Sequence, residues 1–284
     1  MKSCCLFASY FKGNSIPHYI KIYLLELKKH NEKLIFINSN EQLIPQDLFF
    51  LSSNNIDVLT VSNEGFDFGQ WYKALQTISV SEYDYLSFVN DSCVLFSNLT
   101  AFYKWVYSST SDVFGITQSQ VEGKHLQSYF LVFKKNTFPT VLNYFNKYKI
   151  VSSFAEVIST YEIGLSKEII SKGYSLNSFL YNKNEHPEFA PYFYNVKQHI
   201  TDGIPIIKRK IIDQSYRKDE LFTLTRMNFD INPNTYINLI NQQQGSTLIN
   251  LNELKTNDLS FFQLLKFHSL KNFILVVKKI KSFV

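Results

Sequence analysis

The chain has 284 residues, of which 45% are hydrophobic and 19% are charged, and its formal net charge is +5. This composition is typical of a globular protein, and the length allows one large α/β domain with or without a small appendage. The modest positive charge is spread along the chain. It therefore gives no argument for nucleic-acid binding and suits an anionic phosphate ligand or an acidic membrane surface. No apolar run approaches the roughly 18 residues of a membrane-spanning helix.

The first half of the chain alternates between strand and helix patterns. We expect helices over residues 16–30 and 67–78, and strands over residues 4–9, 33–38, 56–61 and 85–89. Short apolar strands separated by helices favour a mainly parallel sheet that helices cover on both faces. The predicted fold class is therefore α/β, with a Rossmann-like sheet and flanking helices.

Polar pairs follow each of these predicted strands. The pairs are Ser9 and Tyr10, Asn38 and Ser39, Ser62 and Asn63, and Asn90 and Asp91. Right-handed crossovers place the carboxyl ends of parallel strands at one edge of the sheet, which is where open α/β sheets bind ligands. The sequence therefore predicts a binding site at this edge, with Ser9, Tyr10 and Asn90 among the residues that contact the ligand.

The second half of the chain is more mixed. We expect strands over residues 112–117 and 125–134 and helices over residues 98–107, 138–148 and 153–172, the last of them stopped by Gly173. Residues 182–205 are loop-like, and the last eighty residues or so are partly helical and more polar. We therefore divide the chain into a domain over residues 1–210 and a C-terminal extension over residues 211–284.

The sequence N-E-G-F-D-F-G-Q-W at residues 63–71 follows a predicted strand and begins a helix. Two glycines allow the backbone to approach a ligand closely, and the helix N-terminus offers unpaired N–H groups. We predict that Asn63, Gly65 and Asp67 shape a donor pocket in which Asp67 accepts hydrogen bonds from a base or from sugar hydroxyls. The alternative is that Asp67 only caps the helix while Trp71 packs in the core.

Asp91 is the predicted metal contact. It is a lone carboxylate between Asn90 and Ser92 at the end of an apolar strand. Hard carboxylate oxygens suit Mg²⁺ or Mn²⁺, and such an ion neutralises the charge on a leaving diphosphate. The alternative is a turn in which Asn90 and Asp91 satisfy backbone amides.

His125 and Gln127 alternate on a predicted strand and so share one face. They are candidates for hydrogen bonds to hydroxyl groups of the donor or acceptor sugar, although a single histidine on a strand can equally be structural. The three cysteines, Cys4, Cys5 and Cys93, have no disulfide or zinc spacing. We expect buried thiols in a reducing compartment, and the short apolar N-terminus is unlike a signal peptide. The sequence therefore predicts a cytoplasmic protein.

Five segments together resemble the rhamnan synthesis protein F family of glycosyltransferases, and the resemblance covers roughly residues 3–210. In order they are N-x-G-x-D-x-G-x-W at 63–71, N-D-S at 90–92, H-L-Q-S-Y-F-L at 125–131, Y-E-I-G-L-S at 161–166 and P-I-I-K at 205–208. The resemblance implies a GT-A-like fold and transfer from a nucleoside diphosphate sugar, with dTDP-L-rhamnose as the usual donor. Where GT-A enzymes have a metal-binding D-x-D, this chain has only N-D-S.

The same resemblance implies two further roles. Glu162 resembles the acidic residue that inverting GT-A enzymes carry at the start of a helix, where it deprotonates the acceptor hydroxyl. The alternative is an ordinary acidic residue that the helix dipole favours in a first turn. Lys208 resembles the late basic residue that reaches the diphosphate of the donor.

The C-terminal residues 262–284 have the pattern of a basic amphipathic helix. Their apolar residues recur at helical spacing, and their lysines lie mostly off that face. Such a helix can lie on an anionic membrane, where lipid-linked glycan acceptors reside, or dock on its own domain or on a partner. The first case would place the protein peripherally at the inner face of the plasma membrane.

The leading hypothesis is a metal-assisted, inverting glycosyltransferase that extends a bacterial surface polysaccharide on an oligosaccharide or lipid-linked acceptor. One alternative is a catalytically inactive glycan-binding or scaffold subunit, which the missing D-x-D supports. The other is a sugar nucleotidyltransferase. It is disfavoured because the loop after the first strand supplies the single glycine Gly13, whereas such enzymes have a glycine-rich loop there.

Overall fold

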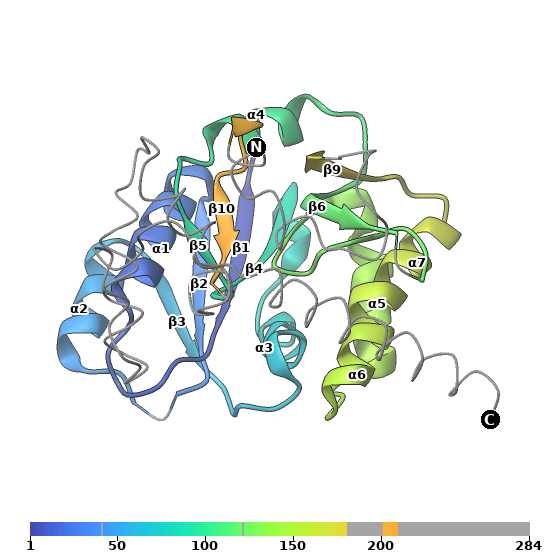
Figure 1. Cartoon of the computed structure of the whole chain (residues 1–284). Coiled ribbons are helices and arrows are strands. Elements are labelled where there is room, and N and C mark those ends of the chain that lie inside the picture. The colour runs from blue at the N-terminus through green and yellow to red at the C-terminus, as the bar shows by residue number, and fades with distance from the viewer. Residues whose placement is uncertain (41, 121, 181–200, 210–284) are drawn as a thin grey trace, which may run out of the picture. The chain divides into compact units, whose positions relative to one another are not determined.

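The computed structural model describes residues 1–40, 42–120, 122–180 and 201–209, and Figure 1 shows their central sheet and flanking helices. The strands are β1 (Ser3–Ser9), β2 (Lys33–Asn38), β3 (Asp57–Thr60), β4 (Tyr85–Asn90), β5 (Cys93–Leu95), β6 (Val113–Ser119), β7 (His125–Leu126), β8 (Phe130–Lys134), β9 (Leu176–Leu180) and β10 (Ile206–Lys208). The α-helices are α1 (His18–His30), α2 (Pro45–Ser53), α3 (Phe66–Leu75), α4 (Thr100–Ser108), α5 (Phe138–Tyr148), α6 (Phe154–Glu156) and α7 (Gly164–Ser171). A π-helix, η3 (Val157–Ile163), joins α6 to α7.

The central sheet has the strand order β3-β2-β1-β4-β8-β6-β7, and β9 pairs with β6. Strands β3, β2, β1 and β4 are parallel, whereas β8 runs antiparallel to β4 and β6. The predicted α/β class with a mainly parallel sheet is confirmed. The register pairs Ala8 with Asn90, so β1 and β4 end side by side.

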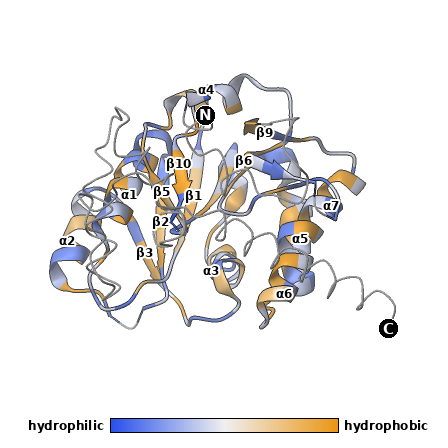
Figure 2. Ribbon diagram, in the orientation of Figure 1, coloured by the Kyte–Doolittle hydropathy of each residue, from blue (hydrophilic) through white to orange (hydrophobic). Residues whose placement is uncertain are grey.

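Helices cover both faces of the sheet, and Figure 2 shows the apolar strands between them. Leu6 of β1 packs in a core with Trp71 of α3 and Phe145 of α5. The next residue, Phe7, points to the other face and meets Tyr23 of α1 with a ring-centroid distance of 5.5 Å. Burial on both faces explains why these strands read as continuous apolar runs. The three cysteines are free and buried, as predicted.

Two predicted elements differ from the structure. The strand predicted over residues 125–134 is divided into β7 and β8, because residues 127–129 leave the strand and 128–129 form a turn. The helix predicted over residues 153–172 is α-helical only at its ends, because η3 forms its middle. It begins with a capping box between Ser153 and Glu156, and Gly173 follows its end with a φ of +84°.

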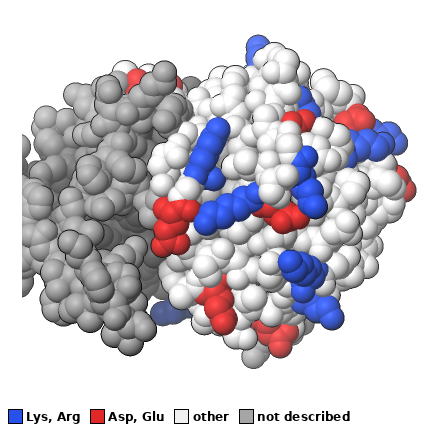
Figure 3. Space-filling model, turned by 90° about the vertical axis from the view of Figure 1, so that its right-hand side faces the viewer, with Lys and Arg blue, Asp and Glu red and all other residues white. Residues whose placement is uncertain are grey.

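Among the described ranges, no helix is long and apolar enough to cross a membrane. The predicted C-terminal extension over residues 211–284, with its amphipathic helix, lies outside the described residues. The domain boundary after residue 210 therefore stays a prediction. On the face drawn in Figure 3, acidic and basic side chains of the described residues alternate rather than gather by sign.

Candidate active site

The Asp91 carboxylate lies at the carboxyl end of β4 and is 8% exposed. Its Oδ2 atom accepts hydrogen bonds from Ser9 Oγ at 3.1 Å and from the Tyr10 backbone N–H at 3.0 Å. Parallel pairing of β1 with β4 brings these three residues together, as their positions after the strands predict. Burial raises the pKa of Asp91, and the Arg209 charge opposes this rise.

Asp67 joins the same end of the sheet through Asn90. The Asn90 side-chain amide donates to Asp67 Oδ2 at 2.5 Å. The N-cap of α3 is Gly65, and no side chain caps that helix. Helix capping by Asp67, the alternative left open by the sequence, is therefore wrong. The other half of that alternative is right, because Trp71 is buried and its Nε1 atom donates to the Leu6 carbonyl at 3.2 Å.

The two glycines of residues 63–71 are explained by packing within the chain. Gly65 has a φ of +73°. A Cβ atom at Gly69 would lie 1.9 Å from the Glu64 carbonyl oxygen. Asn63 is exposed, and within the described part of the chain no hydrogen bond links its side chain to Asp67 or Asp91. The structure thus brings Asp67, but not Asn63 or Gly65, into the hydrogen-bonded cluster.

The pKa of Asp67 is raised from 3.8 to about 7. Burial is the largest cause and the neighbouring negative charge of Asp91 is the next, whereas Lys208 and the Asn90 hydrogen bond act in the opposite direction. At neutral pH the surrounding groups do not fully compensate the negative charge of an ionised Asp67 carboxylate. Its surroundings therefore favour either a proton or a cation.

This shift predicts a pH-dependent stability change for Asp67→Asn. The folded protein binds the Asp67 proton more tightly than the unfolded chain does, so the wild type loses stability as pH rises from about 4 to about 7. The variant lacks this penalty. The excess of its free energy of unfolding over that of the wild type should be up to about 4 kcal/mol larger at pH 8 than at about pH 3, below the unfolded pKa. Urea unfolding at both pH values measures it, and an equal excess at the two pH values would contradict the shift.

Strand β10 carries the basic side of the site. It pairs antiparallel with β5, which places Lys208 opposite Cys93. The Lys208 ammonium group donates to Ser92 Oγ at 3.0 Å and lies 4.7 Å from the centroid of the Tyr129 ring. The predicted phosphate contact Lys208 thus lies beside the N-D-S segment, although 116 residues separate it from Ser92.

Arg209 is a site residue that the sequence reasoning missed. Its backbone N–H donates to the Ser92 carbonyl at 2.8 Å, and its guanidinium group donates to the Tyr19 hydroxyl. Its charge acts on Asp91. The available signal was the basic run that continues past Lys208 in the sequence. Two cationic groups therefore flank Asp91 and Ser92.

Glu162 lies in the π-helix η3, two residues before α7 begins at Gly164. Its Oε2 atom accepts hydrogen bonds from the Ser128 hydroxyl at 2.5 Å and from the Ser128 backbone N–H at 3.4 Å. The turn between β7 and β8 supplies these donors. The sequence did not reveal the π segment, because residue patterns do not distinguish it from continuous α-helix. The role of Glu162 as a base stays a prediction. The alternative of an acidic residue in a first turn is wrong, because α6, η3 and α7 form one continuous helical run with Glu162 in its middle.

His125 and Gln127 both approach Glu162. The Gln127 side-chain amide lies 3.4 Å from Glu162 Oε1, and His125 Nε2 lies 3.8 Å from the same atom. His125 Nδ1 lies 3.0 Å from the Gly123 carbonyl, which assigns a proton to Nδ1. The two side chains are buried and surround Glu162, so their predicted contact with sugar hydroxyls stays a prediction.

One turn connects the two halves of the site. Ser128 holds Glu162, and the next residue, Tyr129, lies against the Lys208 ammonium group. The negative charge of Glu162 also contributes to the raised pKa of Asp67. Ser128 and Tyr129 were not predicted as site residues, although both lie in the H-L-Q-S-Y-F-L segment. Acidic, basic and hydroxyl groups thus gather at the carboxyl end of β4.

The donor set for a metal ion is small. Within the described ranges, no group of three or more His, Cys, Asp or Glu side chains can hold a metal ion. Asp67 and Asp91 are close enough to interact electrostatically, so two carboxylates are available. Mg²⁺ sites in phosphate-transfer enzymes commonly combine one or two carboxylates with substrate phosphates and water. The residues present fit a cation that a bound diphosphate helps to coordinate.

Comparison with solved structures gives matches of low sequence identity. A cytidylyltransferase from Leptospira borgpetersenii is 13% identical over 66% of this chain and 78% of its own, with a TM-score of 0.40. The glycosyltransferase GlyE from Streptococcus pneumoniae is 15% identical over 63% of this chain and 45% of its own, with a TM-score of 0.37. The 4-diphosphocytidyl-2C-methyl-D-erythritol synthase from Anaerococcus prevotii is 10% identical over 71% of this chain and 94% of its own, with a TM-score of 0.40.

Comparison with curated proteins gives no match. The family model described as rhamnan synthesis protein F matches residues 34–266, which is most of the chain. This match includes Asp67 and its partner Asn90, the Ser128 turn, the π-helix with Glu162 and strand β10. The resemblance of the five ordered motifs is thus confirmed, and the chain belongs to the rhamnan synthesis protein F family.

Proposed function

We propose that the protein is a glycosyltransferase that moves a sugar from a nucleoside diphosphate donor to a growing bacterial surface polysaccharide. The observation that carries the proposal is the gathering of Asp91, Lys208 and Glu162 at one end of the sheet. A diphosphate needs cationic partners, and an acceptor hydroxyl needs a base. Both kinds of group are present here, and membership of a rhamnan synthesis family supports sugar transfer over other uses of the same groups.

Lys208 and Arg209 are the proposed partners of the donor diphosphate. Lysine binds phosphate as a compact point charge, and arginine offers a planar fork of donors. Both come from the end of β10 and contact the Ser92 residue that follows Asp91. A leaving diphosphate gains negative charge as the glycosidic bond breaks, so fixed positive charge at this position favours the transition state.

Asp67 and Asp91 are the proposed carboxylate ligands of a divalent cation, Mg²⁺ or Mn²⁺. Such an ion neutralises charge on the leaving diphosphate when it is bound. The two carboxylates have different surroundings. Asp91 is fixed by Ser9 and Tyr10, whereas Asp67 has a pKa near 7, so a bound cation would displace its proton to solvent.

Glu162 is the proposed general base for the acceptor hydroxyl. The Ser128 hydrogen bonds fix its carboxylate, and the side chain remains 20% exposed, so a hydroxyl group can reach it. A base that acts on the acceptor while the diphosphate leaves from the other side gives inversion at the anomeric carbon. His125 and Gln127 would orient this carboxylate and the acceptor. The proposed donor is dTDP-L-rhamnose, which the resemblance to the family implies, and the proposed acceptor is an oligosaccharide or lipid-linked glycan.

A thermal-shift series tests the donor site. We expect dTDP or UDP to raise the melting temperature in the presence of Mn²⁺ and to have a much smaller effect without it. Binding to the native state at 100 times Kd adds about 2.7 kcal/mol of stability. The matched comparison is the same nucleotide in EDTA buffer without Mn²⁺, at equal ionic strength.

The outcomes separate three functions. Stabilisation by a nucleoside diphosphate, followed by transfer of the sugar from the corresponding donor, supports the proposal. No response to any nucleotide would indicate a scaffold or glycan-binding subunit. Binding of a nucleoside triphosphate with a sugar phosphate, and release of pyrophosphate, would indicate a nucleotidyltransferase. Either of these two results would overturn the proposal.

A further inference from the structure

The π-helix η3 is the most irregular helical segment among the described residues. It covers Val157–Ile163, continues directly into α7, and contains Glu162. π-Helical segments are rare, and they are frequently found at functional sites. A change from i→i+4 to i→i+5 hydrogen bonding also displaces backbone carbonyls from the regular ladder. Something in the surrounding structure must therefore hold this segment in its wider turn.

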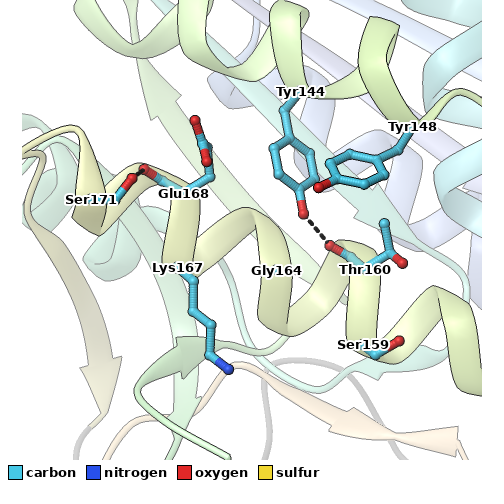
Figure 4. A pocket seen from close by; sticks show the side chains of 8 residues that line it. All are labelled: Tyr144, Tyr148, Ser159, Thr160, Gly164, Lys167, Glu168 and Ser171. Atoms are coloured by element: carbon cyan, nitrogen blue, oxygen red, sulfur yellow. Dashed lines mark hydrogen bonds between the residues drawn. The ribbon is translucent and has the colours of Figure 1, made fainter.

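The side chain of Tyr144 provides this hold. Tyr144 comes from α5 and is 6% exposed. Its hydroxyl group donates a hydrogen bond to the Thr160 carbonyl at 2.5 Å, in the middle of η3. Figure 4 shows the contact in the wall of a cavity of about 410 Å³ between α5 and the η3–α7 run. Tyr148 lines the same cavity, and its ring centroid lies 4.6 Å from that of Tyr144.

Gly164 makes the Tyr144 contact possible. A Cβ atom at Gly164 would lie 2.4 Å from the Tyr144 hydroxyl oxygen and 3.0 Å from the Ser159 carbonyl oxygen. The backbone of Gly164 is ordinary right-handed helix, with φ −66° and ψ −42°, so its conformation does not require glycine. Glycine inside a helix costs about 1 kcal/mol relative to alanine. The close approach of Tyr144 is the physical reason for a glycine at this position.

The hydroxyl contact has a direct consequence for Glu162. Each residue of an α-helix turns the chain by about 100°, so removing the wide turn would rotate residues on one side of it relative to the other. Leu165 and Ile169 of α7 are fixed in the core, as is Val157 at the start of η3. Glu162 lies between these anchors. Its distance to the Ser128 hydroxyl therefore depends on the width of the turn that Tyr144 and Gly164 maintain.

We propose that Tyr144 and Gly164 are positioning residues that hold η3 in its π-helical form and thereby orient the Glu162 carboxylate. This inference rests on the proposed role of Glu162 as the base. Tyr144 acts on η3 through the Thr160 carbonyl and through its ring, whose centroid lies 6.1 Å from that of Tyr161, the residue before Glu162. A local change at Tyr144 should alter catalysis while leaving the Asp91 and Lys208 side of the site intact.

The test compares Tyr144→Phe with Tyr148→Phe. Both variants remove one hydroxyl group from α5 in the same cavity, but only Tyr144 hydrogen-bonds to η3 in the described part of the chain. We expect Tyr144→Phe to lower kcat by about 10- to 100-fold and to leave KM for the donor nearly unchanged, since a displaced base affects the chemical step. The pH dependence of kcat should also shift. Tyr148→Phe should retain both wild-type kcat and its pH profile.

Hydrogen exchange gives a second measurement that does not require activity. Backbone amides of residues 160–166 should exchange faster in Tyr144→Phe than in Tyr148→Phe, and those of β1 and β4 should not change. Wild-type exchange and kcat in Tyr144→Phe would overturn the inference. If Glu162→Gln keeps wild-type activity while η3 exchange still increases in Tyr144→Phe, the base assignment fails but the hold on η3 is supported. Gly164→Ala should reproduce the faster exchange without loss of the Tyr144 hydroxyl.

Discussion

Replacing Glu162 with glutamine should lower kcat for sugar transfer by about 1000-fold, because the amide cannot accept the proton of the acceptor hydroxyl. Glutamine has nearly the same shape and keeps an oxygen that can accept the Ser128 hydrogen bonds. Binding of the donor should therefore remain within about twofold of wild type, as the affected group lies on the acceptor side. Single-turnover kinetics with saturating donor measures the chemical step directly.

Glu156→Gln is the matched control for this variant. Glu156 lies six positions earlier on the same helical run, and glutamine can take its place in the capping box with Ser153. The control should keep wild-type kcat. If Glu162→Gln transfers sugar as fast as the wild type, Glu162 is not the base. If both variants lose activity equally, the effect arises from the helix and not from the Glu162 carboxylate.

Replacing Asp91 with asparagine should abolish most of the Mn²⁺-dependent stabilisation by a nucleoside diphosphate. Transfer should fall by about 100-fold, equivalent to about 3 kcal/mol of transition-state stabilisation. The variant keeps an oxygen for the hydrogen bonds from Ser9 and Tyr10, but it loses the charge that would bind a cation and balance Arg209. Calorimetric titration of Mn²⁺ and dTDP into each protein separates metal binding from nucleotide binding.

Asp57→Asn is the matched control, because it removes a carboxylate far from the proposed metal site. Asp57 begins β3, at the opposite end of the parallel strands, and pairs with Lys33 at the surface. Exposed ion pairs contribute about 0–1 kcal/mol, so this variant should fold and bind nucleotide normally. Retention of the Mn²⁺-dependent heat in Asp91→Asn would contradict the metal assignment. Loss of nucleotide binding with and without Mn²⁺ would instead assign Asp91 to the shape of the pocket.

The parallel half of the fold was predictable because its signals are local. Lys33–Asn38 forms a strand with the predicted bounds, since a buried run between polar residues leaves little choice. Once the strands are parallel and the crossovers right-handed, Ser9 and Asn90 must end at one edge. The proximity of Asp91 to the Ser9–Tyr10 segment follows once β1 pairs with β4, whereas the hydrogen bonds between them are seen only in the structure.

Contacts between distant segments were harder to predict. The β10 pairing that places Lys208 and Arg209 beside Ser92 joins residues more than a hundred positions apart. The prediction that Lys208 contacts phosphate came from the motif resemblance. No periodicity in the sequence indicates that Lys208 lies beside Ser92. Arg209 was missed for the same reason, because its role depends on the distance of its charge from Asp91.

The sequence by itself determined the α/β class, the edge at which polar groups gather and the identity of Asp91 and Glu162 as candidates. Only the tertiary structure decided how those groups are held. Asp67 acquires a pKa near 7 because folding places it in low-dielectric surroundings near Asp91. Glu162 lies in a π-helix because Tyr144 from another helix reaches the Thr160 carbonyl past Gly164. Solvation and side-chain contact at long range are properties of the fold, whereas strand and helix patterns are properties of neighbouring residues.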